Sequence, residues 1–145
     1  MNKGVVVKFY DPGFTPDSKL IYSVIGSTYK GKWVFVRHNK RTTFEIAGGH
    51  IEEGESAMEA AKRELMEETG AIKFSIVCVA TYSVTMNNET AFGRLYYADI
   101  QSIGDIPDIS EIGEVILADS LPENLTHPFI QPYLFKRVQE YLRFQ

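Results

Sequence analysis

Three glutamates, Glu64, Glu67 and Glu68, stand at the spacing that places side chains on one face of an α-helix. Like charges three and four residues apart repel one another, so they would weaken an isolated helix. Clustered carboxylates are also the hard oxygen ligands that Mg²⁺ or Mn²⁺ prefers. An acidic helix face that is simply solvated is the alternative interpretation. The cluster therefore indicates either a divalent-cation site or a charged surface.

Small residues near the cluster favour the cation site. Ala57, Ala60 and Ala61 share or border the same sector of the predicted helix at 56–69, which would let this face approach other backbone closely. A purely solvated face has no need of small residues. The pair Gly48-Gly49 precedes the helix through a short loop and offers bare carbonyl and N–H groups. Carboxylates and a carbonyl oxygen together suit Mg²⁺ or Mn²⁺.

The order of these residues matches a known signature. Gly49 is followed after five residues by Glu55, and after seven more by the segment 63–71, which reads Arg-Glu-Leu-Met-Glu-Glu-Thr-Gly-Ala. This resembles the Nudix box at every position except the last, where Ala71 replaces a bulky aliphatic residue. We expect Ile72 to fill that packing role. Seven fixed positions at usages of about 5–7% each would match by chance on the order of once in 10⁸ placements.

The resemblance implies an enzyme of the Nudix hydrolase family, which cleaves a phosphoanhydride bond in a nucleoside diphosphate-linked substrate with Mg²⁺, for which Mn²⁺ can substitute. It assigns the metal to Glu64, Glu67, Glu68 and the Gly48 carbonyl. Arg63, part of the catalytic set, is expected to act structurally by pairing with Glu67, Glu59 or Glu55 and orienting them. Three further positions of the box are expected to be structural: Gly49, Glu55 at the junction of loop and helix, and Gly70.

Nudix enzymes often supply one more acidic residue from a later loop, and the segment 110–115 resembles that region. Glu111 and Glu114 are both candidates, and a loop carboxylate in water is the alternative for either. Glu64 and Glu111 compete for the role of the base that activates water. We favour Glu111, because a residue already bound to metal is a poorer proton acceptor.

Substrate contacts are less specific. The basic loop 37–41 begins with Arg37, which would either hold substrate phosphates or lie in solvent. By resemblance to MutT-type enzymes, Asn124 is expected to read a guanine edge, with His127 as its competitor. Four aromatic residues could stack on a base, although core packing is the more common role of such residues: Tyr22, Phe44, Tyr82 and Phe129.

The patterns of ADP-ribose, dinucleoside-polyphosphate, NADH and coenzyme A hydrolases are absent, and the segment 85–87 contains no proline. We therefore expect hydrolysis of a nucleoside triphosphate, including 8-oxo-dGTP, to monophosphate and pyrophosphate, as in the bacillar MutT-type branch that the chain resembles. An ADP-sugar or dinucleotide pyrophosphatase is the alternative. A non-catalytic nucleotide-binding module would typically lose box carboxylates, which this chain keeps.

Several strands and a second helix must position these residues. Strands are predicted at 4–10, 20–29, 32–37, 73–85, 92–100 and 115–118, and a second helix at 128–144. A strand-like segment also leads from Phe44 into Gly48-Gly49. With the first helix embedded among the strands, the sequence predicts an α+β fold, the Nudix α/β/α sandwich around a mixed sheet, as a single domain over 1–145.

Composition excludes several other classes. The net charge of −4 argues against a surface for duplex nucleic acid, and no apolar run is long enough to cross a membrane. The start of the chain, 1–4, precedes an apolar run too short for a signal peptide, so we expect a cytoplasmic enzyme. The lone Cys78 is expected to be a small buried residue of a strand. A homodimer is compatible with the sequence.

Overall fold

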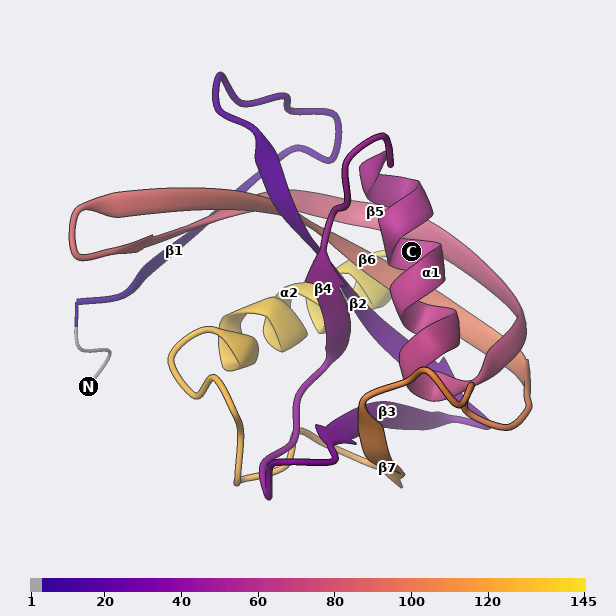
Figure 1. Ribbon diagram of the computed structural model, residues 1–145. Helices are drawn as coiled ribbons and strands as arrows, with labels where there is room; N and C mark the ends of the chain where they lie inside the picture. Colours follow the sequence, from indigo (N-terminus) through magenta and orange to yellow (C-terminus); the bar gives the residue numbers. More distant parts are fainter. Residues whose placement is uncertain (1–3) are drawn as a thin grey trace.

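The structure, a computed structural model, describes residues 4–145 and consists of a central sheet between two helices (Figure 1). Residues 1–3 lie outside the described residues. They belong to the segment 1–4, for which the sequence analysis predicted no signal peptide. The helices are α1 (Ala57–Thr69) and α2 (Gln131–Arg143). The strands are β1 (Val6–Tyr10), β2 (Leu20–Tyr29), β3 (Lys32–His38), β4 (Ala47–His50), β5 (Ala71–Met86), β6 (Glu89–Ile103) and β7 (Ile112–Ala118).

The strands form one mixed seven-stranded sheet in the order β1-β5-β6-β2-β3-β7, with β4 attached to β2. β2 and β6 are parallel, and the other pairs are antiparallel. β3 pairs with β2 only at Thr28 and Tyr29, and β4 takes over the same edge of β2 from Ile25 to Tyr22. The sheet therefore divides between β3 and β4, and the two glycines of β4 lie beside this division.

Helix α1 begins and ends where the sequence predicts. The side chain of Ser56 accepts the backbone N–H of Glu59 at 3.1 Å, and the Glu59 carboxylate accepts the backbone N–H of Ser56 at 2.8 Å. This reciprocal pair satisfies donors that the first turn leaves unpaired. Gly70 ends the helix in the left-handed region, at φ 78°, where a side chain would be strained. Both ends of α1 are thus fixed by local bonds.

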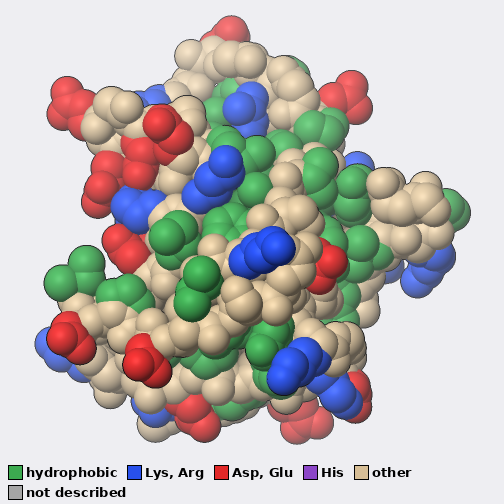
Figure 2. Space-filling model, turned by 90° about the vertical axis from the view of Figure 1, so that its right-hand side faces the viewer, with side chains coloured by type: hydrophobic (Ala, Val, Ile, Leu, Met, Phe, Trp, Pro, Cys, Tyr) green, Lys and Arg blue, Asp and Glu red, His purple; other side chains and the backbone are tan. Residues whose placement is uncertain are grey.

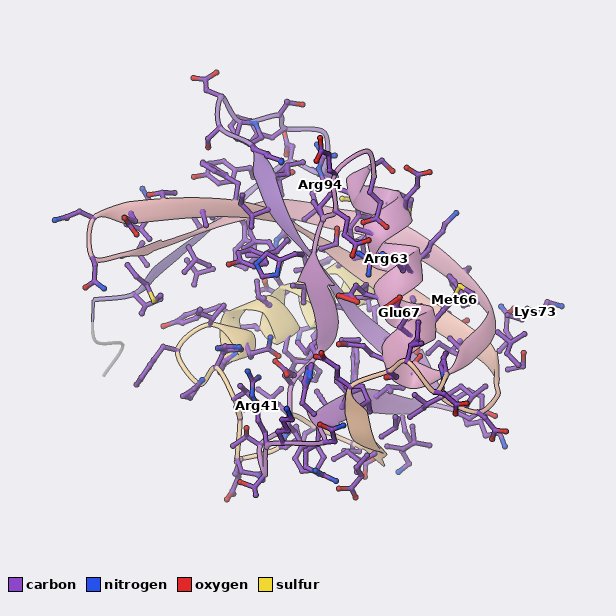
Figure 3. All side chains as sticks on the ribbon, viewed as in Figure 1. Arg41, Arg63, Met66, Glu67, Lys73 and Arg94 are labelled. Atoms are coloured by element: carbon purple, nitrogen blue, oxygen red, sulfur yellow. The ribbon has the colours of Figure 1, made fainter. Side chains whose placement is uncertain are left out.

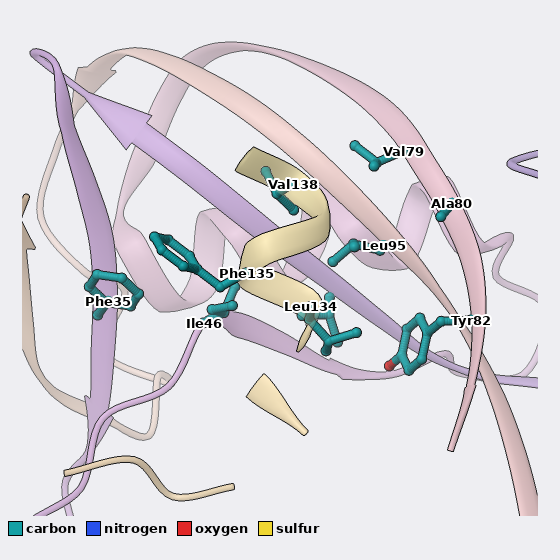
Figure 4. Packing of buried hydrophobic residues seen from close by; sticks show 10 residues of the cluster. Phe35, Ile46, Val79, Ala80, Tyr82, Leu95, Leu134, Phe135 and Val138 are labelled. Carbon is teal, nitrogen blue, oxygen red and sulfur yellow. The ribbon is translucent and has the colours of Figure 1, made fainter. Parts of the chain in front are cut away.

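Two hydrophobic clusters hold the helices on opposite faces of the sheet. Neighbouring residues of a strand point to opposite faces, and the clusters divide accordingly: Val24 belongs to one and Ile25 to the other. α2 inserts Leu134, Phe135 and Val138 into the first cluster (Figure 4). α1 inserts Ala57, Ala61 and Leu65 into the second. The predicted α/β/α arrangement is confirmed.

Some predicted boundaries differ from the structure. β1 begins at Val6, β7 begins three residues earlier than predicted, and α2 begins at Gln131 rather than at residue 128. β5 and β6 extend to a two-residue turn at Asn87 and Asn88, which both have positive φ, as a tight hairpin requires. Pairing of β5 with β6, and of β7 with β3, accounts for the strand residues that lack a strong local pattern.

Two packing expectations change. Ile72 does not fill the role of the missing aliphatic residue of the box, because its side chain is 66% exposed. Ala71 itself is buried in the cluster beneath α1, so the position keeps its place in the core with a smaller side chain. Cys78 lies in β5 but is half-buried, with contacts from its sulfur to the carbonyls of Ala80 and Pro12.

The anchoring of α1 can be tested by truncating its buried face. Leu65 is fully buried, so Leu65→Ala should lower the free energy of unfolding by about 2–5 kcal/mol through lost contacts and a residual cavity. Met66 on the same helix is 47% exposed, and Met66→Ala should change it by no more than about 0.5 kcal/mol. Urea denaturation measures both. Equal losses in the two variants would contradict this packing of α1.

Candidate active site

The close approach of α1 to β4 creates the site. A Cβ placed on Gly49 would occupy the position of the Glu64 carboxylate, and one on Gly48 would lie 2.7 Å from the carbonyl oxygen of Ser23. Ser23 in turn donates its hydroxyl to the Ala57 carbonyl at 2.7 Å. The glycine pair is therefore required here by space, since φ is unexceptional at both positions. The small residues expected on this helix, Ala57, Ala60 and Ala61, are buried.

Arg63 links helix α1 to the loop that precedes it. Its Nε donates to Glu55 at 2.6 Å and its Nη2 to the other oxygen of Glu55 at 2.9 Å, while Nη2 also reaches the His50 carbonyl at 3.1 Å. Its Nη1 lies 3.2 Å from Glu64 and 3.5 Å from Glu67. Glu55 also accepts the backbone N–H of Glu52, so that loop and helix are joined. Figure 3 shows Arg63 and Glu67 on the side of α1 that faces β4.

A cavity of about 320 Å³ lies between α1, β4 and the loop before β7. The three predicted metal-binding glutamates of α1 line it, together with the Gly48-Gly49 pair. Glu111 lines it from the opposite side, and its carboxylate is 83% exposed. The structure thus brings together the ligand set and the later acid that the sequence predicted. The lining also includes His38, His50, Ile109 and Ser110.

The carboxylates of this cavity are partly withdrawn from water. Burial, together with the charges of neighbouring carboxylates, raises the pKa of Glu68 to about 8 against the opposing hydrogen bond from the Gly48 N–H. Burial likewise raises the pKa of Glu64 to about 7, opposed by the charge of Arg63. By contrast, the hydrogen bonds from Arg63 hold the pKa of Glu55 at about 2. Glu64 and Glu68 therefore lack enough nearby positive charge to offset their burial, whereas Arg63 supplies that charge to Glu55.

Two residues that the sequence analysis did not single out lie at the centre of the site. His38, at the end of β3, directs Nε2 toward Glu45 at 3.0 Å and toward Glu68 at 3.6 Å, and its Nδ1 lies 3.9 Å from Glu111. Glu45 is 9% exposed. His38 fell within the basic loop 37–41, where its neighbours gave no reason to separate it. A charged residue between Phe44 and Ile46 was the one signal for Glu45.

A larger cavity of about 820 Å³ adjoins the first, and Gly48, Gly49 and His50 line both. Its wall includes Tyr22, whose ring lies 4.8 Å from that of His50, and the buried Tyr82. Of the four aromatic candidates, these two reach the cavity, and Tyr82 also packs in the core. The polar part of the wall comes from Glu45, Glu89, Thr90, His127 and Gln131.

Three residues lie outside the lining of both cavities. Arg37 and Asn124 were predicted to contact the substrate, and Glu114 was the alternative to Glu111. Arg37 donates to Glu114 at 3.1 Å and to the carbonyl of Arg41 at 3.0 Å, which joins β3, β7 and the basic loop. Asn124 donates its amide to the Thr42 carbonyl at 3.0 Å. Between the competing pairs, the geometry brings Glu111 and His127 to the cavities rather than Glu114 and Asn124. The substrate roles of Arg37 and Asn124 stay predictions.

The donors of the smaller cavity suit a hard divalent cation. Carboxylate oxygens predominate, and the raised pKa values of Glu64 and Glu68 indicate that a positive charge beside these two would be favourable. Within residues 4–145, no group of three or more histidine, cysteine or acidic side chains is already arranged around one metal position. Glu64 and Glu67 turn toward Arg63 and Glu68 toward Gly48, so these side chains would reorient to bind an ion.

Comparison with known proteins decides the family. The model of the NUDIX domain matches residues 20–131. The chain belongs to the Nudix family. It is also 34% identical to a Bacillus subtilis (strain 168) protein named "Putative 8-oxo-dGTP diphosphatase YtkD", over 84% of this chain and 75% of that protein. The predicted Nudix hydrolase is thereby confirmed, and enzymes of this family generally use a divalent metal and act on small nucleotides.

Solved structures of Nudix proteins share the fold. A mutant of the Bacillus subtilis pyrophosphohydrolase BsRppH superposes with a TM-score of 0.75 at 30% identity, over 94% of this chain and 90% of that one. A UDP-X diphosphatase superposes with a TM-score of 0.72 at 19% identity, over 92% and 67%. The second likeness shows the Nudix fold alone. Both cover nearly the whole length of the chain described here.

The surface carries side chains of both charges. Figure 2 shows acidic and basic side chains together on one face of the molecule. Neither helix within residues 4–145 has the length and apolar composition needed to cross a bilayer. The cytoplasmic location and the homodimer stay predictions of the sequence.

The raised pKa of Glu68 predicts a pH dependence of stability. A raised folded-state pKa means that the folded chain binds the proton more tightly than the unfolded chain. The resulting stabilisation is present below the ordinary value of 4.5 and is lost as pH rises through about 8. In metal-free buffer, the melting temperature of the wild type should therefore fall relative to Glu68→Gln between pH 5 and pH 9. Thermal melts with a chelator measure the difference.

The control variant for these melts is Glu53→Gln, on the exposed loop before α1, which reports the effect of removing one surface carboxylate.

Addition of millimolar Mg²⁺ at pH 8 should raise the melting temperature of the wild type more than that of Glu68→Gln, because a ligand of the folded state stabilises it by mass action. Parallel curves for wild type and Glu68→Gln across this pH range would contradict the burial of an ionisable Glu68.

Proposed function

We propose that the protein is an Mg²⁺-dependent nucleoside triphosphate pyrophosphohydrolase that favours guanine nucleotides, 8-oxo-dGTP among them. One observation carries the proposal: an acidic cavity of about 320 Å³ adjoins a larger, aromatic cavity of about 820 Å³. The first suits a cation with phosphates, and the second has the size and lining of a small-molecule site. The shared wall of Gly48, Gly49 and His50 would lie beside the phosphate chain.

The relatives support this substrate class. The Bacillus subtilis relative is named for 8-oxo-dGTP, and BsRppH is named a pyrophosphohydrolase. Within the larger cavity, the ring of Tyr22 is available for stacking, and His127 and Gln131 offer polar groups. The amide oxygen of Gln131 already accepts the backbone N–H of Ile46 at 2.7 Å, which leaves its amide N–H groups to face a ligand. His127 thus replaces Asn124 as our candidate for contact with the base.

In the proposed reaction, water attacks a phosphorus of the triphosphate chain, and nucleoside monophosphate and pyrophosphate separate. Bound Mg²⁺ would neutralise phosphate charge and lower the pKa of the attacking water. Glu64, Glu67, Glu68 and the Gly48 carbonyl would hold it. Arg63, anchored to Glu55 and the His50 carbonyl, pairs with the helix carboxylates Glu64 and Glu67 and would orient them. These residues position and neutralise, which is the main task in phosphoryl transfer.

Glu111 is our candidate for the residue that removes the proton from water. It lies across the cavity from α1, and its carboxylate is 3.9 Å from Nδ1 of His38. Its backbone carbonyl accepts the N–H of Asn39 at 2.8 Å, which ties the loop to the end of β3. Glu64 is the competitor. Because it belongs to a coupled cluster of carboxylates, its proton affinity is shared with its neighbours.

The substrate proposal predicts the products. With Mg²⁺, dGTP or 8-oxo-dGTP should yield monophosphate and pyrophosphate, detected by chromatography and a pyrophosphate assay, and a chelator should abolish turnover. ADP-ribose, a dinucleoside polyphosphate and UTP serve as competing substrates in the same assay. Selective cleavage of ADP-ribose or of the dinucleotide, with triphosphates inert, would sink the proposal in favour of the alternative substrate class.

The two candidates for the general base, Glu111 and Glu64, can be distinguished by how the activity of each variant responds to Mg²⁺ concentration. Glu111→Gln should lower kcat by about 10²–10⁴-fold at saturating Mg²⁺, since general-base catalysis contributes about that much. It should also flatten the acidic limb of the pH–rate profile. Glu64→Gln should instead regain activity as Mg²⁺ is raised, because a missing ligand is partly compensated by metal concentration. A wild-type kcat in Glu111→Gln at saturating metal would reassign the base.

A further inference from the structure

Glu45 is a buried carboxylate that the proposed reaction does not use. It directly precedes β4, by way of Ile46, and its backbone exchanges two hydrogen bonds of 2.9 Å with Val36 of β3. This pairing fixes the main chain of Glu45 where β3 and β4 separate. The residue is 9% exposed and forms part of the wall of the larger cavity. A carboxylate with so little access to water needs partners within the protein.

Its partners are two imidazoles and one guanidinium. Oε1 of Glu45 lies 3.0 Å from Nε2 of His38 and 3.4 Å from Nη1 of Arg41. Oε2 lies 3.6 Å from Nε2 of His127. Arg41 comes from the loop after β3, labelled in Figure 3, and is half-exposed. The two oxygens of Glu45 therefore reach two histidines from segments that are far apart in the sequence.

The two histidines belong to different cavities. His38 lines the smaller cavity, where its ring lies 3.6 Å from Glu68 and 3.9 Å from Glu111. His127 lines the larger cavity. His38 thus contacts two of the residues assigned to cleavage, whereas His127 lies where the base would bind. Glu45 contacts both histidines and so joins the walls of the two cavities, which also share Gly48, Gly49 and His50.

We propose that Glu45 is a positioning residue that couples recognition of the nucleobase to bond cleavage. It holds His38 beside Glu68 and Glu111, and it holds His127 toward the base. The assignment of base and phosphates to the two cavities rests on the proposed function. A base that draws His127 into place thereby fixes Glu45 and, through it, the carboxylates that act on the phosphates.

A purely structural Glu45 makes a different prediction. Removal of a charge paired only for stability would lower the melting temperature and reduce the amount of active enzyme, with KM unchanged. If Glu45 is a positioning residue, substitution of each of its two histidine partners should change a different kinetic constant. His38→Gln should lower kcat by about 10–100-fold, the usual cost of losing a residue that orients metal ligands. His127→Gln should instead raise KM for dGTP by about 2–10-fold, as the loss of one hydrogen bond does.

The experiment measures kcat and KM for dGTP in Glu45→Gln, His38→Gln, His127→Gln and the two double variants that contain Glu45→Gln. Glu45→Gln keeps the shape of the side chain, and we expect it to lower kcat and raise KM together. The double variants should lose little more than Glu45→Gln alone, because each histidine would act through Glu45. Additive losses, or an unchanged kcat and KM in Glu45→Gln, would overturn the proposal.

Imidazole resonances test the arrangement without any activity. The chain has three histidines, so their ring signals in NMR spectra are easily assigned by substitution. Glu45→Gln should shift the signals of His38 and His127 and leave that of His50. If Glu45→Gln does not fold, His38→Gln should still shift the His127 signal, since both rings contact one carboxylate. An unmoved His127 signal in His38→Gln would overturn the coupling.

Asp119→Asn is the matched control. Asp119 is an exposed carboxylate that pairs with Lys32, outside the lining of both cavities. The substitution makes the same chemical change as Glu45→Gln and should leave kcat, KM and all three histidine signals at their wild-type values. Should no nucleotide be cleaved by the wild type, the proposed function fails, and the histidine signals still decide whether Glu45 couples the two rings.

Discussion

The contact between Glu64 of α1 and the bare backbone of Gly49 is the constraint on which the site depends. A helix that carries clustered carboxylates can form one wall of a cavity only if the opposite wall leaves room for them. Gly48 and Gly49 leave that room and hold β4 against β2 at the same time. Alanines of the same helix are buried, two of them in the hydrophobic cluster beneath it. The spacing between box glycine and helix glutamate is thus a packing requirement.

The same contact brings like charges out of water, which opposes folding. Burial raises the pKa values of Glu64 and Glu68, whereas the two hydrogen bonds of Arg63 satisfy Glu55 fully. Arg63 therefore stabilises the frame of the box and neutralises the inner carboxylates only in part. His38 and the Gly48 N–H reach Glu68 from the other side. A site that keeps unmet negative charge in this way is suited to a cation, and it remains less stable than an apolar core would be.

The sequence predicted the parts of the molecule that obey local rules. The capping pair of Ser56 and Glu59, the terminal Gly70 and the period of α1 all depend on residues within a few positions of one another. Long-range pairing decided the rest: it extends β7 to Ile112 and buries Ala71 rather than Ile72. The roles of His38 and Glu45 arise where β3 and β4 separate, and no spacing along the chain indicates such a meeting.

The parallel pairing of β2 with β6 has a consequence for how the chain folds. β4, α1 and β5 all lie in the connection between these two strands, so two of the three elements that enclose the acidic cavity are carried on one long crossover, and the third, the loop before β7, follows β6. Closure of a long connection costs chain entropy before its contacts form, and folds dominated by such contacts are slow to form. The hairpin of β5 and β6 can form early from its local turn. The acidic cavity is lined on one side by Glu111, which follows β6, so its full lining is present in a newly synthesised chain only after β6 and the loop before β7 have been made.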